Sequence, residues 1–483
     1  MLKSLKRLTK HSAVYGFGHI FTRMVNFLLL PLYTNRLPAD EYGVSALIFA
    51  FLAVMTPIYT YGIDAAFLRY FILSDDPVRK RRVFSTAFWA VFTSGCIFTI
   101  LIYVFADFFS GLLFSHGNYH HLIRLASVIL FFDVMTFLPF LYLRAEEKSI
   151  LFTVFKFFNV IINVSFNIYF LVYLDRGVEG IFLANVWASA LTFLVILFIL
   201  IKEVSFSFNK NDFVELCKFG LPYLPSVLSV VVLDLVDRPI LERLLGLEQT
   251  GIYSAGLKLG MFMSLFVTAF RFAWHPFFLS TSKQQDAKEV FSKVLTYFAT
   301  IGMGIFLVIS FYINEIVQFK FFGHTLIGSE YWQGTKVVPA ILLSYVFYGI
   351  YVNFIIGVYL KEKTKYLPLV TGAGVLVNIV LNFVLIPIIG MMGAAMAKVC
   401  GYVVMSMVMF LFNQRIYAIR YEFVRLLKLA VVTAGVFYFG YIFKTDWHAF
   451  MKFLFVLAFP VLLFLSGFFD KRELAKLKAL VHG

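Results

Sequence analysis

Fourteen apolar stretches, each about long enough to cross a bilayer, follow one another along the chain and are joined by short connectors. In hydrocarbon every backbone amide must be hydrogen-bonded within the protein, so a spanning segment of this kind is a helix. The pattern therefore predicts an all-α polytopic membrane protein with 14 transmembrane helices. The expected spans are residues 12–33, 43–68, 83–106, 120–143, 150–174, 179–201, 219–237, 250–270, 294–313, 337–360, 366–389, 392–413, 426–443 and 449–469.

The composition supports a membrane protein. Hydrophobic residues make up 61% of the chain and charged residues 14%, and the mean hydropathy is +0.86, which is more apolar than a soluble domain. Most of the 42 lysines and arginines lie in every second connector, and the positive-inside rule therefore predicts cytoplasmic N- and C-termini. The net charge of +15 is then explained by contact with anionic lipid headgroups, and no nucleic-acid partner is expected.

The first apolar segment lacks a small-residue cleavage site, so we expect it to remain as a signal anchor in a bacterial cytoplasmic (inner) membrane. The three cysteines, Cys96, Cys217 and Cys400, lie in or beside apolar spans without CxxC spacing. Neither a disulfide nor a metal site nor a cofactor is expected.

Short patterns recur about 210 residues apart and indicate an internal duplication. Residues 37–43 and 245–251 share the form L-x-x-[D/E]-x-x-G, and both follow the first span of a half. Asn163 and Asn167 in the fifth span recur as Asn378 and Asn382 in the eleventh.

Each asparagine pair is followed by a glycine-bounded turn, at residues 177–185 in one copy and 390–398 in the other. We therefore predict a six-helix bundle at 1–205, a second at 206–415, and helices 13 and 14 with a cytoplasmic tail at 416–483. Each half crosses the membrane an even number of times, so the copies have the same orientation and enclose a central cleft.

Charged residues inside the hydrocarbon are the candidates for function, because each costs at least about 2.5 kcal/mol on insertion scales. Arg23 lies near the middle of the first span, with His19 and Asn26 on the same helix face. Lys258 lies about a third of the way into the eighth span. Both cations are too deep to reach the interface easily, and we expect them to converge on one cavity and bind substrate.

Four carboxylates, Asp64, Asp133, Asp234 and Asp237, are candidates for ion coupling or charge pairing. A purely structural alternative pairs Asp234 or Asp237 with Lys258, and Asp64 with its neighbour in the same span.

Four further cations lie near span ends, where a long side chain can reach the interface. Arg69, which is also the possible partner of Asp64, stays a substrate-binding candidate, whereas Arg124, Lys156 and Lys398 are expected to extend toward the headgroups.

Two prolines, Pro222 and Pro225, open the seventh span and remove backbone donors from it. We expect a helix bend there, either as a moving part or as a static kink.

Several motifs in order resemble one family. They are residues 10–16, 27–33 and 41–43, then 61–70 ending in Arg69-Tyr70, and in the second half 237–238, 251–258 and 273–277. With these residues the chain resembles the polysaccharide transport (Wzx-type) flippases of the MOP superfamily, relatives of MATE exporters and the lipid II flippase MurJ.

The resemblance implies a MATE-like fold of two six-helix bundles that alternates between inward and outward states. It also implies an undecaprenyl-pyrophosphate-linked oligosaccharide as cargo, flipped to the outer leaflet. The implied partners are membrane lipids and enzymes of the same pathway, a glycan polymerase and glycosyltransferases. Helices 426–469 are the expected groove for the lipid tail.

Three alternatives stay open. A MATE-type multidrug antiporter would favour carboxylates in the cavity, and a lipid II flippase of the MurJ type would carry an Arg-Asp pair where this chain has Leu30-Pro31-Leu32. A membrane glycosyltransferase would need catalytic groups in an outside loop, and the longest such connector, 314–336, has no evident acid/base constellation. The absence of a G-x(4)-G-K-[ST] loop argues against direct ATP coupling.

Overall fold

The computed structural model describes residues 27–469 and residue 473, apart from residues 28, 322, 362, 364, 365 and 443–448. The helices of the first half are α2 (Leu30–Arg36), α3 (Ala39–Thr60), α4 (Ile63–Ile72), α5 (Pro77–Val104), α6 (Ala106–Leu113), α7 (His120–Ala145), α8 (Ser149–Ile168), the π-helical turn η1 (Tyr169–Tyr173) and α9 (Gly177–Leu200).

The second half begins with α10 (Lys210–Gly220), the 3₁₀ turn η2 (Leu221–Tyr223), α11 (Leu224–Leu235), α12 (Asp237–Thr281) and α13 (Ala287–Gln318). It continues with the strands β1 (Lys320–Phe321) and β2 (His324–Thr325), the 3₁₀ segment η3 (Ser329–Val337), α14 (Val338–Phe354), α15 (Ile356–Leu360), α16 (Leu367–Ile389) and α17 (Met391–Ile416). The last helices are α18 (Phe423–Ile442) and α19 (Ala449–Leu465).

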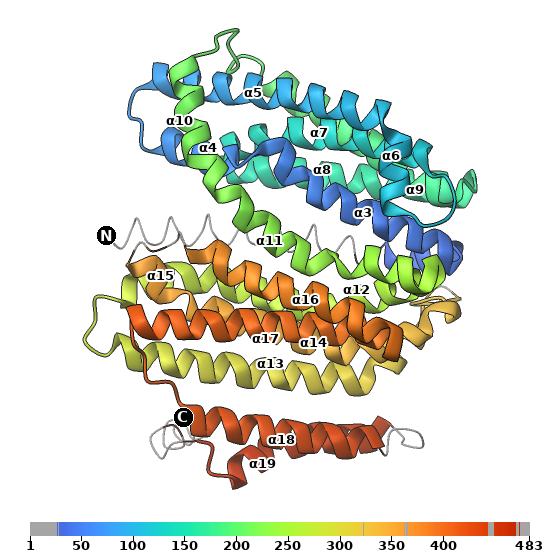
Figure 1. Cartoon of the computed structure of the whole chain (residues 1–483), viewed down its shortest axis with the longest axis vertical. Coiled ribbons are helices and arrows are strands. Elements are labelled where there is room, and N and C mark those ends of the chain that lie inside the picture. The colour runs from blue at the N-terminus through green and yellow to red at the C-terminus, as the bar shows by residue number, and fades with distance from the viewer. Residues whose placement is uncertain are drawn as a thin grey trace.

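The helices form two bundles and an appended pair (Figure 1). Helices α3 to α9 make the first bundle, α11 to α17 make the second, and α18 and α19 pack on α13 at the side away from the first bundle. Within the described residues, eleven helical segments are long and apolar enough to cross a membrane. Most of the predicted first span, 12–33, lies outside the described residues, so the number of 14 stays a prediction.

Glycines in the left-handed region end or begin helices where the sequence pattern placed turns. Gly177 (φ 54°) and Gly390 (φ 61°) stand at the starts of α9 and α17, which confirms the two glycine-bounded turns of the repeat. A third break, at Tyr61 (φ 35°) and Gly62 (φ 79°), separates α3 from α4. Because glycine has no Cβ, it adopts these dihedral angles at little cost.

The two bundles touch through the glycines of the repeated L-x-x-[D/E]-x-x-G pattern. A Cβ atom on Gly43 of α3 would lie 2.1 Å from the carbonyl oxygen of Leu247, and one on Gly251 of α12 would lie 1.8 Å from that of Ala39. Only hydrogen fits at either position. The repeat thus brings the backbones of α3 and α12 into direct contact, as small residues do in membrane helix pairs.

Polar contacts between the first bundle and α12 to η3 of the second gather at the same end of the bundles. The Asn35 amide donates to the Thr325 carbonyl (2.9 Å), and the Tyr331 hydroxyl donates to the Leu37 carbonyl (2.8 Å). The Glu242 carboxylate accepts from the amide and hydroxyl of Ser115, at 2.8 and 2.9 Å. These residues lie in or next to predicted outside connectors, so the end predicted to face outward is the one held together.

The seventh predicted span changes bundles at its prolines. The predicted span 219–237 begins at the end of α10, which packs on α4 and α5 of the first bundle. Arg82 of α5 and Asp212 of α10 form an ion pair of 2.7 Å there. The chain then passes through the 3₁₀ turn η2, which contains Pro222, into α11, and Pro225 lies in the first turn of that helix. Helix α11 packs mainly on α16 of the second bundle.

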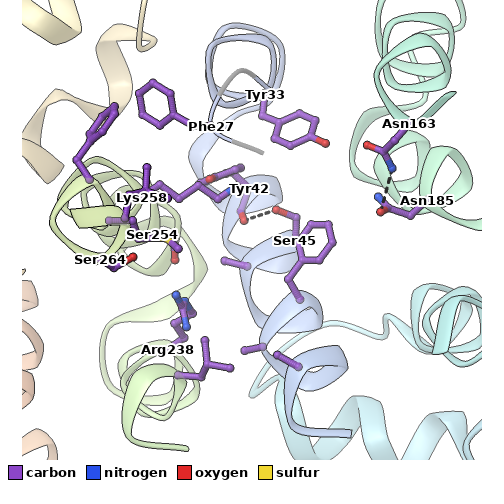
Figure 2. Close-up of a pocket in the computed structure, with 18 residues that line it drawn as sticks. Phe27, Tyr33, Tyr42, Ser45, Asn163, Asn185, Arg238, Ser254, Lys258 and Ser264 are labelled. Carbon is purple, nitrogen blue, oxygen red and sulfur yellow. Dashed lines mark hydrogen bonds between the residues drawn. The ribbon is translucent and has the colours of Figure 1, made fainter. Parts of the chain in front are cut away.

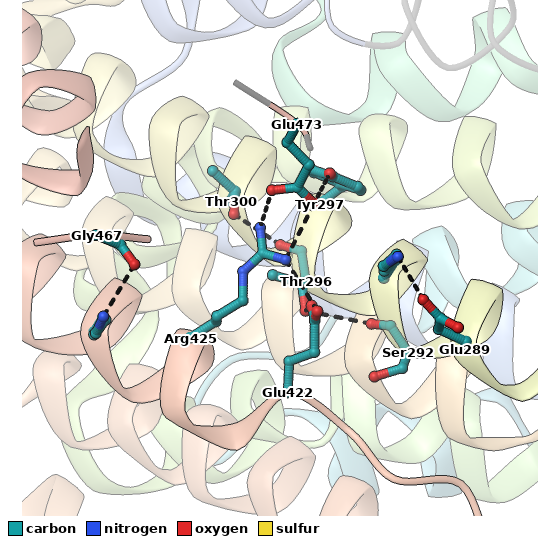
Figure 3. A network of polar contacts seen from close by, with 11 residues as sticks. Glu289, Ser292, Thr296, Tyr297, Thr300, Glu422, Arg425, Gly467 and Glu473 are labelled. Carbon is teal, nitrogen blue, oxygen red and sulfur yellow. Dashed lines mark hydrogen bonds and ion pairs between the residues drawn. The ribbon is translucent and has the colours of Figure 1, made fainter. Parts of the chain in front are cut away.

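The appended pair is fixed to α13 near both of its ends. Near one end Thr296 donates to Glu422 (2.6 Å), and Arg425 pairs with Glu422 (2.9 Å) and with Glu473 (3.0 Å), as Figure 3 shows. Near the other end Lys452 of α19 pairs with Glu315. These contacts join α18, α19 and the following segment to the second bundle.

We predict that Gly251→Ala destabilises the protein by about 1 to 3 kcal/mol, because a methyl group overlaps the Ala39 carbonyl and must push α3 and α12 apart. Thermal unfolding of the purified protein in detergent measures this effect. Gly372→Ala in α16 is the matched control, since its Cβ would meet nothing within 4 Å. Equal losses of melting temperature in both variants would contradict a tight contact between the bundles.

Candidate functional site

A cavity of about 460 Å³ lies between the two bundles. Helices α3, α8 and α9 supply its wall from the first bundle, and α11 and α12 supply the wall from the second (Figure 2). The volume lies within the range of about 300 to 1,000 Å³ usual for small-ligand pockets. The central position agrees with the cleft that the duplication predicts.

Lys258, predicted from its depth in the eighth span, lines this cavity. It belongs to the part of α12 that packs on α3, and its ammonium group lies 5.6 Å from the ring centre of Tyr33 and 5.3 Å from that of Tyr42. Aromatic faces attract a cation without neutralising it. Among the described residues Lys258 forms no ion pair, so its charge remains available to an anion in the cavity.

Arg238 is a second cation of the cavity wall and was not among the predicted site residues. It follows Asp237 directly, at a point where the sequence predicts an outside connector, but the chain is helical there and begins α12. Its Nη1 donates to the carbonyl oxygen of Asp234 at 3.4 Å. Figure 2 shows Arg238 and Lys258 on the same side of the cavity, and no aspartate or glutamate is among the described lining residues.

The opposite wall carries two asparagines, Asn163 of α8 and Asn185 of α9 (Figure 2). The Asn163 amide donates to Asn185 Oδ1 at 3.1 Å. Asn167 donates to the Asn163 side chain at 3.0 Å and accepts from the Tyr33 hydroxyl at 2.9 Å. A chain of side-chain contacts therefore runs from the asparagines of the first half through Tyr33 to Lys258.

The structural alternative in which Asp234 or Asp237 pairs with Lys258 is wrong as to the partner. Both carboxylates pair instead with Lys398 of α17, at 3.3 and 3.0 Å. Lys398 is fully buried, so the expectation that it extends to the interface is also wrong. It is only the eighth residue of its helix, but Asp234 of α11 and Asp237 of α12 supply its partners.

Tyrosines complete this ion cluster. Tyr253 donates to Asp237 at 2.6 Å, and Tyr345 donates to Asp234 at 3.1 Å. A buried lysine is tolerated when carboxylates and hydrogen bonds compensate its lost hydration. The cluster therefore fixes α11 and α12 to α17 next to the cavity.

The remaining predicted residues lie apart from the cavity or outside the described residues. The structure does not pair Asp64 with Arg69, whose guanidinium lies 4.6 Å from the ring centre of Phe219. Asp133 accepts a hydrogen bond from Ser189. Lys156 lies over the ring of Phe140 (4.0 Å), and Arg124 lies over Tyr103 (5.3 Å).

The predicted stripe of His19, Arg23 and Asn26 falls outside the described residues. In the part of the chain that the structure describes, no group of histidines, cysteines and carboxylates has the arrangement of a metal site.

Residues 8–282 match the family described as "Polysaccharide biosynthesis protein", which is more than half of the chain. A curated relative, "Lsg locus putative protein 1" of Haemophilus influenzae, is 21% identical over 361 residues, covering 71% of this chain and 85% of the relative. The family match connects the chain with proteins of polysaccharide synthesis.

Solved structures match the fold over most of its length. The lipid II flippase MurJ in an inward closed conformation has a TM-score of 0.75 and 15% identity, covering 94% of this chain and 97% of that chain. An inward-facing MATE multidrug transporter of the MOP superfamily has a TM-score of 0.62 and 15% identity, covering 83% and 98%. The protein is thus a multi-pass membrane protein with a MATE-like fold.

We predict that Lys398→Met lowers the free energy of unfolding by about 3 to 5 kcal/mol, because two carboxylates then stay buried without their cation. The triple variant Asp234→Asn, Asp237→Asn, Lys398→Met should recover part of this loss, since it removes the uncompensated charges. The melting temperature and the monodisperse yield in detergent measure both effects. Lys156→Met serves as a comparison, and an equal loss there would argue against a special role of the cluster.

Proposed function

We propose, starting from the fact that this chain belongs to the polysaccharide biosynthesis protein family, that it flips an undecaprenyl-pyrophosphate-linked oligosaccharide across the bacterial inner membrane. The cargo moves from the cytoplasmic to the outer leaflet. One observation carries the proposal: the described wall of the central cavity holds two cations, Lys258 and Arg238, and no carboxylate.

The charge of the cavity suits the head of such a lipid. A pyrophosphate with its sugars cannot enter hydrocarbon without losing its hydration, so its path must supply water and cations. The Arg238 guanidinium offers a planar fork to phosphate oxygens, and the Lys258 ammonium offers a point charge on a flexible stem. The polyprenyl tail stays in the bilayer, with the groove beside α18 and α19 as its proposed path.

Alternating access is part of the proposal. Both termini lie in the cytoplasm, and the halves 1–205 and 206–415 move relative to each other, with 416–483 attached to the second. Because the bundles are joined at the end predicted to face outward, the structure corresponds to a state closed to the outside. Pro222 and Pro225 provide the bend where the seventh span changes bundles. His19, Arg23, Asn26 and Arg69 are proposed as further contacts of the head during its passage.

In this proposal, fewer carboxylates are candidates for coupling to an ion gradient than the sequence alone indicates. Asp234 and Asp237 already compensate Lys398, which leaves Asp64 and Asp133 as the first candidates for proton or sodium binding. The enzymes that build and polymerise the glycan are the proposed pathway partners.

The experiment that tests the function is transport of the lipid itself. Purified protein in liposomes should move a fluorescent undecaprenyl-pyrophosphate-linked oligosaccharide between leaflets. Rescue of peptidoglycan synthesis in cells lacking their lipid II flippase would favour lipid II as the cargo. Efflux of cationic dyes without lipid movement would favour a multidrug transporter, for which a cationic cavity is poorly suited.

We predict that Lys258→Glu abolishes flipping and that Lys258→Gln lowers its rate at least tenfold, because the anionic head then meets repulsion or loses one of its counter-charges. Export of surface glycan in the native host and the liposome assay both measure this. Lys320→Glu, in the exposed hairpin strand β1, is the control. Normal export by Lys258→Glu at equal protein level would refute the cationic cavity as the transport path.

A further inference from the structure

The two copies of the repeated asparagine pattern have different surroundings. Asn378 and Asn382 of the second half are fully buried, whereas Asn163 of the first half is half-buried and lines the cavity. Asn185, which also lines the cavity, occupies the position that Lys398 holds in the second half, the ninth residue of the stretch that begins at the turn glycine. In the second half the residues of the pattern lie in packed helix contacts and in the ion cluster. In the first half Asn163 and Asn185 line the cavity.

The two asparagines of the cavity have donors to spare. A side-chain amide carries two N–H groups. One N–H of Asn163 binds Asn185 Oδ1 (3.1 Å), and one N–H of Asn185 binds the Ile181 carbonyl (2.8 Å). Within the described residues the second N–H of each amide makes no hydrogen bond. The pair is therefore held in place by its neighbours and still offers donors to a ligand.

The surroundings of this amide pair favour a neutral ligand rich in hydroxyl groups. Aromatic rings of Tyr33, Tyr42 and Phe49 contribute to the same cavity, and such rings pack well against the apolar C–H faces of a sugar. The cations, in contrast, stand on the opposite wall (Figure 2). The cavity thus has a charged side from the second bundle and an uncharged, amide-bearing side from the first.

We propose that Asn163 and Asn185 form a sugar subsite that binds hydroxyl groups of the sugar attached directly to the pyrophosphate, while Lys258 and Arg238 bind the phosphates. This inference rests on the proposed function and adds to it which residues select the glycan. A buried site built to hydrogen-bond a hydroxyl rejects ligands that lack it, because its polar groups would be left without partners.

The test compares binding of two kinds of lipid to the full-length protein in lipid nanodiscs. The probes are bare undecaprenyl pyrophosphate and undecaprenyl pyrophosphate carrying glucose, galactose, N-acetylglucosamine or N-acetylgalactosamine. We expect the unaltered protein to bind at least one sugar-bearing probe more tightly than the bare lipid. Asn163→Leu should reduce this preference about three- to tenfold, the effect of losing one hydrogen bond to a ligand.

Asn159→Leu is a matched control. Asn159 lies one helical turn before Asn163 on α8 and bridges the same two helices through Thr192 on α9 (3.0 Å), but it does not line the cavity. This variant should keep the preference for the sugar. Asn185→Ser is the second subsite variant, in case Asn163→Leu does not fold, and it should reduce the preference in the same direction.

The outcomes separate the subsite from the function on which it rests. The subsite is refuted if folded Asn163→Leu and Asn185→Ser keep the full preference, if Asn159→Leu loses it equally, or if no sugar-bearing probe binds more tightly than the bare lipid. Binding of none of the probes by the unaltered protein would overturn the proposed function as well. Lys258→Gln should weaken all probes alike and leave the preference for the sugar intact.

Discussion

A charge inside hydrocarbon must be paired or must face water, and this constraint explains how the chain uses its deep lysines. Lys398 is fully buried and held between Asp234 and Asp237, so it stabilises the packing of three helices. Lys258 has aromatic rings beside it and the cavity in front of it. One lysine is compensated within the protein, and the other is left for a ligand to compensate.

The contact between Gly43 and Gly251 determines where that cavity lies. It holds α3 and α12 together at one end of the bundles, with backbone atoms too close for any side chain, and the polar contacts of Glu242 and Tyr331 gather at the same end. Any transport cycle by alternating access must separate these surfaces. They meet through glycine backbones, a few hydrogen bonds and packed aromatic rings, among them Tyr42 and Tyr331 with ring centres 5.5 Å apart.

The sequence predicts the helices, the duplication and the two glycine turns. Hydropathy, the spacing of the asparagines and the positions of the glycines are local properties of the sequence, so they can be read without knowing the packing. The depth of Lys258 in its predicted span also identifies it as a cavity residue. The missed residues depend on packing between distant segments: Arg238 lies where an outside connector was expected, and α12 begins there as a helix. Lys398 was misjudged because its partners on α11 and α12 come from more than 160 residues away.

A duplicated protein that carries an asymmetric head needs unequal halves. Lys398 and Asn185 occupy equivalent positions of the repeat, yet one completes an ion cluster and the other faces the cavity. If the phosphates bind the second bundle and the first sugar binds the first, the distance between the two sides of the site changes whenever the bundles move relative to each other. The affinity for the head then depends on the state of the transporter, and such a difference between states is what lets a ligand shift the equilibrium between them.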